Sequence, residues 1–137
     1  MASKLIEQKE LIGYNKKSFS IPFGCTEIWI EHLDGMYKNE ELVLKKLSHD
    51  KTIFCRPSIT SLICFNLDET YITENILTEI CKVLISTRKQ FRKICFVRTN
   101  RLIKKKLKKA LGGKGFLVEF YNDFEMAKEW LVNNNYK

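Results

Sequence analysis

The sequence is poor in residues that mark linkers and in patterns that mark secreted or membrane proteins. Its 137 residues include two prolines and six glycines, too few for a long disordered linker. No apolar run approaches the roughly 20 residues of a membrane-spanning helix, and the start, MASKLIEQKE, lacks the apolar segment of a secretion signal. We therefore expect a cytoplasmic protein that does not span a membrane, with a polar lead-in at 1–17 and one domain at 18–137.

Cysteine and histidine form no recognisable framework or metal site. The five cysteines are odd in number and include no C-x-x-C pair, which argues against a disulfide framework. Cys64 and Cys95 lie inside apolar runs, so we expect them to be buried and reduced. Because His32 and His49 are the only histidines, we expect no metal site and no cofactor.

The motifs of common enzyme classes are absent as well. The chain has no G-x-G-x-x-G or Walker loop, no G-x-S-x-G and no H-E-x-x-H. The glycine-rich stretch GGKG at 112–115 follows an expected helix, where glycine is a common terminator, and does not join a strand to a helix as a phosphate loop does. We therefore expect no catalytic residues and no enzyme activity.

Acidic residues are missing from one long stretch of the chain. No Asp or Glu lies between Glu79 and Glu119, whereas 12 of the 24 lysines and arginines lie between Arg88 and Lys114. The net charge of the whole chain is +8. This charge makes an anionic partner plausible but carries no information about the fold.

Apolar periodicity predicts several strands. The runs at 61–67 and 94–97 are almost continuously apolar, which is typical of strands buried on both faces of a mostly parallel sheet. Residues 26–33 alternate, with Ile28 and Ile30 on one face. Residues 18–24 are expected to form an edge strand because they include Pro22, and 116–121 is the last expected strand.

Helices are expected between these strands. The spacing of apolar residues predicts them at 39–49, 74–90, 100–111 and 122–132, with asparagines at 39, 100 and 122 as N-caps. Residues 51–55 fit either a short strand or the end of the first helix. The apolar face of the third helix is expected to comprise Leu102, Ile103, Leu107, Ala110 and Leu111. Together these elements predict an α/β fold, with one mixed, mainly parallel sheet of four to five strands and helices packed against it.

Three segments in this order resemble the STAS domain family, which includes anti-sigma-factor antagonists and the cytosolic tails of sulfate transporters. IWIEHLDGMYKNEELVLKKL (28–47) is similar to the family's opening strand, glycine turn and helix. SLICFNLDETYITENILTEI (61–80) resembles its central strand, functional loop and next helix, and KICFVRTNRLIKKKLKKALGGKGFLVEFYNDFEMAKEWL (93–131) resembles its ending. The likeness covers about residues 18–132 and implies a regulatory domain that contacts another protein.

The sequence departs from the family where regulatory members carry a D-S-S-G-type motif with a phosphorylated serine. That place reads Thr73-Glu74-Asn75-Ile76, without serine or glycine. Three interpretations are open. Thr73 and Glu74 could be an ordinary N-cap and first-turn acid, Glu74 could mimic a permanent phosphate, or Thr73 could be the phosphoacceptor.

Two binding surfaces are predicted, and the first is preferred. By resemblance, an unidentified protein partner would contact the loop after the central strand and the helix that it opens, through Asp68, Glu69, Thr70, Tyr71, Thr73, Glu74 and Asn75. Open α/β sheets place their sites at such loops. The alternative is a site for nucleic acid or an anionic lipid surface on the basic helix, formed by Arg98, Arg101, Lys104, Lys105, Lys108 and Lys109 and flanked by Arg88, Lys89, Arg92 and Lys93.

Overall fold

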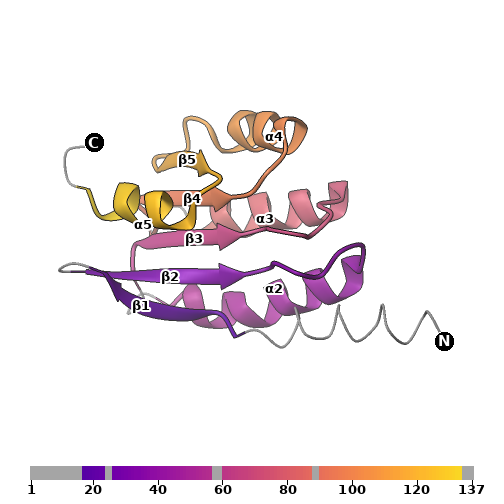
Figure 1. Ribbon diagram of the computed structural model, residues 1–137, viewed down its shortest axis with the longest axis horizontal. Helices are drawn as coiled ribbons and strands as arrows, with labels where there is room; N and C mark the ends of the chain where they lie inside the picture. The colour runs from indigo at the N-terminus through magenta and orange to yellow at the C-terminus, as the bar shows by residue number, and fades with distance from the viewer. Residues whose placement is uncertain (1–16, 24–25, 57–59, 88–89, 134–137) are drawn as a thin grey trace.

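The structure, a computed structural model, describes residues 17–23, 26–56, 60–87 and 90–133 and contains one five-stranded sheet (Figure 1). Its strands are β1 (Phe19–Phe23), β2 (Thr26–His32), β3 (Leu62–Asn66), β4 (Lys93–Val97) and β5 (Leu117–Tyr121), and they lie side by side in chain order. β1 pairs antiparallel with β2, and the other three pairings are parallel. The predicted α/β class and mixed, mainly parallel sheet are confirmed.

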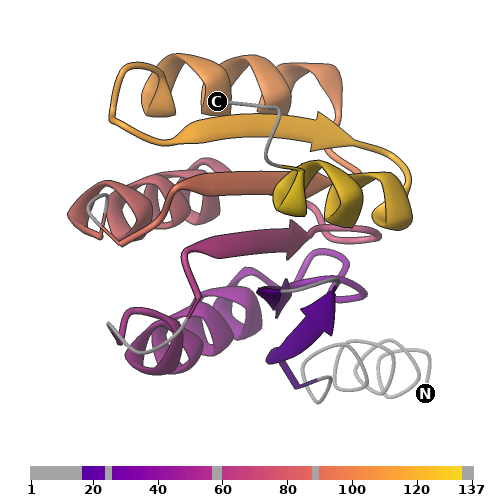
Figure 2. The same ribbon diagram turned by 90° about the vertical axis from the view of Figure 1, so that its left-hand side faces the viewer.

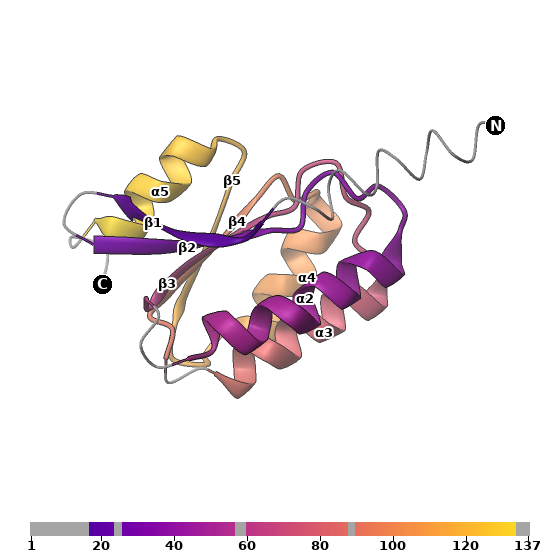
Figure 3. The same cartoon turned by 90° about the horizontal axis from the view of Figure 1, so that it is seen from below.

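Within the described ranges, four helices cover the two faces of the sheet unequally. They are α2 (Glu40–Phe54), α3 (Glu74–Ser86), α4 (Arg101–Leu111) and α5 (Phe124–Val132). Figures 2 and 3 show α2, α3 and α4 on one face and α5 alone on the other. Successive crossovers of the same hand place their helices on the same face of a sheet, and α5, which leads to no further strand, crosses to the opposite face.

The two apolar runs form the centre of the sheet, as predicted. β3 and β4 are neighbours, with Cys64 opposite Cys95. In β3, Ile63 and Phe65 belong to the core under the three helices, whereas Leu62 and Cys64 belong to the core under α5. Continuous apolar sequence is therefore required here because both faces of each strand are buried. Cys64 and Cys95 are buried free thiols, as expected.

The structure decides or corrects several local predictions. Residues 51–54 continue α2, which is the second of the two alternatives left open for 51–55. The N-cap of α5 is Asp123 and not Asn122, because the Asp123 side chain accepts a hydrogen bond from the backbone N–H of Glu125. Leu102, expected on the apolar face of α4, is 60% exposed. The predicted lead-in, apart from Lys17, lies outside the described residues.

Lys93 is also placed differently from its prediction as part of a positive flank. It is buried at the start of β4, where its ammonium group donates hydrogen bonds to the backbone carbonyls of Trp130 and Asn133 at 2.9 and 2.6 Å. These carbonyls lie at the C-terminal end of α5, where a cation is favourable. Burial, followed by the nearby Arg92, lowers the pKa of Lys93.

In the described part of the chain, no helix is long and apolar enough to cross a bilayer.

A buried polar cluster fastens α2 to β1 and β2. Lys46 donates hydrogen bonds to Asp50 and to Ser18 at 2.9 and 2.7 Å, and Ser18 in turn donates to Asp50 at 2.8 Å. Glu31 of β2 lies beside them with no exposed surface, and its Oε1 accepts a hydrogen bond from the Trp29 indole at 3.0 Å. Its Oε2 has no hydrogen-bond partner among the described residues while the carboxyl is ionised.

The ionisation of this cluster follows from its burial. Desolvation, then the neighbouring Asp50 carboxylate, raises the pKa of Glu31 well above its ordinary value, although Lys46 and Trp29 act in the opposite direction. Burial alone would raise the pKa of Asp50, but hydrogen bonds from Glu31, Lys46 and Ser18 outweigh burial and lower it. A protonated Glu31 that donates to Asp50 satisfies both carboxyl groups.

We predict that Glu31→Gln stabilises the protein at alkaline pH. A carboxyl group whose pKa is raised on folding binds its proton more tightly in the folded state, so stability falls as the pH rises from its unfolded pKa toward its folded pKa. Glutamine keeps both hydrogen bonds and carries no proton to lose. The expected gain is about 1–3 kcal/mol at pH 9 and disappears near pH 4, as measured by urea unfolding.

The matched control for this prediction is Glu27→Gln, on the same strand but exposed. It should leave the pH dependence of stability as it is in the wild type. A Glu31→Gln protein with an unchanged pH profile would show that Glu31 is not held protonated.

Candidate functional site

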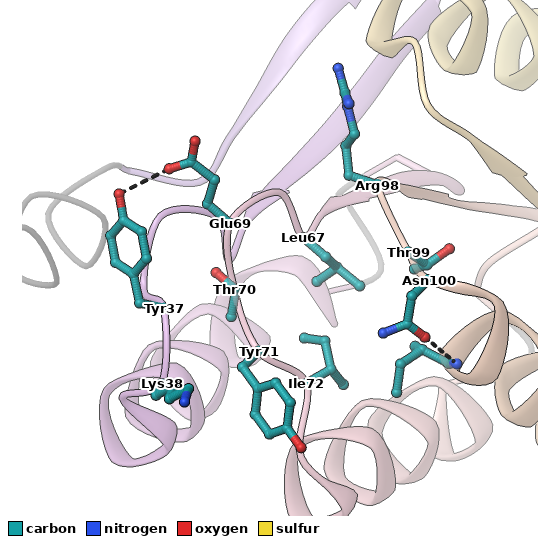
Figure 4. Close-up of a pocket in the computed structure, with 11 residues that line it drawn as sticks. Tyr37, Lys38, Leu67, Glu69, Thr70, Tyr71, Ile72, Arg98, Thr99 and Asn100 are labelled. Atoms are coloured by element: carbon teal, nitrogen blue, oxygen red, sulfur yellow. Dashed lines mark hydrogen bonds between the residues drawn. The ribbon is translucent and has the colours of Figure 1, made fainter.

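A pocket with an apolar floor lies at the carboxyl ends of β3 and β4 (Figure 4). It has a volume of about 670 Å³. Three connections meet there, namely those from β2 to α2, from β3 to α3 and from β4 to α4. The lining residues are Tyr37, Lys38, Leu67, Glu69, Thr70, Tyr71, Ile72, Arg98, Thr99, Asn100 and Ile103. Parallel strands place the loops that follow them at the same edge of the sheet, which is where sites in such folds occur.

The loop after β3 is fixed by the connection after β2. The backbone N–H groups of Gly35 and Tyr37 donate to the carbonyls of Asp68 and Glu69 at 2.8 and 2.9 Å, and the N–H of Tyr71 donates back to Tyr37 at 2.7 Å. Residues 37 and 70 form an isolated parallel bridge. The Thr70 hydroxyl adds a bond to the Leu33 carbonyl at 2.6 Å. The loop is thus held by its backbone, which leaves most of its side chains available.

Left-handed backbone conformations gather at this pocket. Among the described residues, three that are not glycine have positive φ, namely Tyr37 at 50°, Glu69 at 54° and Arg98 at 66°. All three line the pocket, one from each of the three connections. Such conformations cost free energy at residues with a side chain, and they concentrate at functional sites. Their clustering therefore supports a functional role for this edge.

The predicted partner-binding residues divide into three groups. Glu69, Thr70 and Tyr71 line the pocket, whereas Asp68 lines a second hollow on the other side of the loop, of about 570 Å³. Tyr71 is 61% exposed. The Glu69 carboxylate accepts a hydrogen bond from the Tyr37 hydroxyl at 2.9 Å (Figure 4). The remaining predicted residues, 73–75, lie at the start of α3 and are engaged with neighbouring helices.

Thr73 is the N-cap of α3. Its Oγ1 accepts a hydrogen bond from the backbone N–H of Ile76 at 3.2 Å and donates one to the carboxylate of Glu40 on α2. Glu74, in the first turn, forms an ion pair with Lys106 of α4, and the Asn75 amide lies 3.5 Å from Glu40. These contacts match the first interpretation, an ordinary cap with a first-turn acid. A phosphate on Thr73 would face the Glu40 carboxylate; its role as a phosphoacceptor stays a prediction.

Eight lining residues were not among the predicted partner-binding residues, and four of them, which belong to neither predicted surface, lie in the connections that precede α2 and α4. Tyr37 and Lys38 precede α2, and Thr99 and Asn100 precede α4. Asn100 was predicted only as a helix cap, and this is confirmed because its Oδ1 accepts from the N–H of Ile103 at 2.8 Å. The sequence signal that could have found these residues is their position, since each follows a strand that ends at the same edge.

The basic residues of the alternative surface do not form one uniform face. Arg101, Lys105, Lys108 and Lys109 are exposed on α4, and Arg98 is exposed at the pocket. Lys104 and Lys108 lie 5.6 and 5.8 Å from the centre of the Phe120 ring, within the range of cation–π attraction. Among the described residues, no group of three or more metal-ligating side chains is found.

Comparisons of this chain with family models, with curated proteins and with solved structures return no match. The resemblance to STAS domains therefore stays a prediction from the sequence pattern.

We predict that Thr73→Glu destabilises the protein more than Thr73→Ala does. Loss of the cap alone should cost about 1 kcal/mol. A carboxylate at position 73 should add repulsion from Glu40, because like charges in contact are unfavourable. Urea unfolding of both variants, each in the wild-type and the Glu40→Gln background, measures the two contributions.

In the Glu40→Gln background, the excess cost of Thr73→Glu should largely disappear. Thr73→Ser, which keeps the cap, serves as the control. Equal stability of Thr73→Glu and the wild type would mean that the helix start accommodates a negative charge, and it would favour the phosphoacceptor interpretation.

Proposed function

We propose that this chain is a non-catalytic regulatory or adaptor module that binds another protein through the 68–75 loop and the start of α3. The observation that carries the proposal is Tyr71, an aromatic side chain that is 61% exposed on a loop fixed by backbone hydrogen bonds. Tyrosine is among the residues that dominate the energy of protein interfaces. A loop that is already ordered loses little conformational entropy when it binds.

The surroundings of Tyr71 suggest the character of the partner. Asp68 and Glu69 are exposed on the same loop, and Glu74 is exposed at the helix start despite its ion pair with Lys106. A partner that offers an apolar socket with basic groups at its rim would complement this surface. The resemblance to STAS domains points to the same loop, because regulatory members use the helix start after the central strand.

A second candidate function is polyanion binding by α4. The observation in its favour is that Arg101, Lys105 and Lys108 are exposed at helical spacing, and no ion pair involves them among the described residues. Several cations on one helix can bind nucleic acid or an anionic lipid surface with a strong dependence on salt. We rank this function second because Lys93 and Lys106 are used inside the fold, which reduces the continuous positive surface.

We predict that Tyr71→Ala removes the capture of specific partners from a lysate of the native host. The affinity of a partner that contacts the loop should fall by at least about tenfold, the effect of losing an interface hot spot. The measurement is quantitative affinity capture, followed by calorimetry with the most strongly depleted partner. Met126→Ala is the matched control because this α5 side chain is 53% exposed but lies far along the chain on the other face of the sheet.

A variant with Lys104, Lys105 and Lys108 all changed to Glu separates the two candidate functions. It should keep the partners that Tyr71→Ala loses. If the charge-reversed variant alone loses its partners, and this binding weakens steeply with salt, polyanion binding replaces protein docking as the function.

A further inference from the structure

We propose that the pocket at the carboxyl edge of the sheet binds a small molecule with a planar aromatic body and one carboxylate. This inference does not depend on protein docking. The volume of about 670 Å³ lies within the usual range of small-molecule sites. Three independent features of the lining specify the ligand, namely the floor, a single oriented donor and the charge at the rim.

The floor of the pocket is apolar. Leu67 and Ile72 come from the loop after β3, and in Figure 4 their side chains point into the cavity. Ile103 of α4 is the third apolar residue of the lining. Leu67 and Ile103 are otherwise almost fully buried in the core. The exposed Tyr71 ring stands at the mouth beside Ile72 (Figure 4). An aromatic ligand would cover the floor and pack against this ring. Such a pair of rings contributes more binding free energy than the burial of apolar area alone.

A single amide donor is oriented by the start of α4. The Oδ1 of Asn100 is taken up by the helix cap, where it accepts from the N–H of Ile103 at 2.8 Å. The Nδ2 group is therefore the end that faces the cavity, as Figure 4 shows. Asn100 is exposed in the free protein. A ligand that covers its amide must place a hydrogen-bond acceptor there, because an amide that is buried without a partner is costly.

The lining carries two cations and one carboxylate, and this balance favours an anionic acceptor. Lys38 and Arg98 line the pocket, and the N-terminus of α4, which carries partial positive charge, opens onto it. The one acidic lining residue, Glu69, already accepts the Tyr37 hydroxyl. Arg98 points away from the floor in Figure 4, so it acts through its field, and Asn100 makes the direct contact. A carboxylate fits this arrangement better than a neutral acceptor.

The test uses three probes that share an indole ring and differ in charge: indole-3-acetate, indole-3-acetamide and tryptamine. Each is titrated into the full-length protein and followed by the backbone amide signals in NMR. We expect indole-3-acetate to shift the signals of residues 67–72 and 98–103. The acetamide should bind roughly tenfold more weakly, the usual effect of losing a charge-assisted hydrogen bond, and tryptamine should produce no saturable shift.

Asn100→Asp is the decisive variant. Aspartate caps helices as well as asparagine does, so thermal stability should be unchanged, but the donor is replaced by a negative charge. Indole-3-acetate should bind this variant at least about tenfold more weakly than the wild type. Asn39→Asp, the same change at the cap of α2, is the matched control and should bind as the wild type does.

Four results would overturn the proposal. They are the absence of any shift at millimolar probe, equal affinity for the three probes, shifts confined to the lysines of α4, and unchanged binding of indole-3-acetate to Asn100→Asp. Either of the first two results would exclude the proposed class of ligand. The third would place the anion on the basic surface of α4, and the fourth would exclude Asn100 as the donor. None of them bears on whether Tyr71 docks a protein.

Discussion

The pairing of β3 with β4 is the contact on which the rest of the structure depends. Each strand is buried on both faces, and the Phe65, Phe96 and Phe120 rings stack in a row across three strands, with centroids 5.1 and 5.5 Å apart. Parallel strands cannot be joined by a tight turn, so each is followed by a loop and a helix that returns across the sheet. The same requirement brings the loops after β2, β3 and β4 to one edge. The pocket is therefore a consequence of how the core is built.

Features with a local cause could be predicted from the sequence. The strands at 62–66 and 93–97 follow from continuous apolar runs, and the caps at Asn39, Thr73 and Asn100 follow from side chains that bond their own helix. Two of the predictions that failed concern tertiary context. Leu102 has helical spacing for burial, but its side chain is 60% exposed. Lys93 is buried because carbonyls at the end of α5, almost 40 residues later, offer it hydrogen bonds.

The candidate site could be predicted only in part, for the same reason. Glu69, Thr70 and Tyr71 follow one of the two buried-strand runs of the chain and could be placed at the edge of a sheet from that fact alone. Tyr37 and Lys38 reach the pocket through backbone hydrogen bonds between residues 35–37 and 68–71, whose register depends on β2 lying beside β3. The left-handed backbone at Tyr37, Glu69 and Arg98 could not be predicted, because none of these residues is glycine, the residue that usually marks this conformation in a sequence. Tertiary hydrogen bonds hold these conformations, and only the three-dimensional structure reveals them.

The distribution of charge shows why composition is a weak guide to function in this protein. The chain carries +8, yet three of its lysines serve the fold: Lys46 is buried with Asp50, Lys93 caps α5, and Lys106 joins α4 to the start of α3. A lysine used in this way is no longer available to neutralise a phosphate group of a polyanion. Arg101, Lys105, Lys108 and Lys109 remain exposed on α4, whereas the pocket combines an apolar floor, an oriented amide donor and two cations at its rim. Specificity requires such a combination, because charge alone attracts anions of every kind.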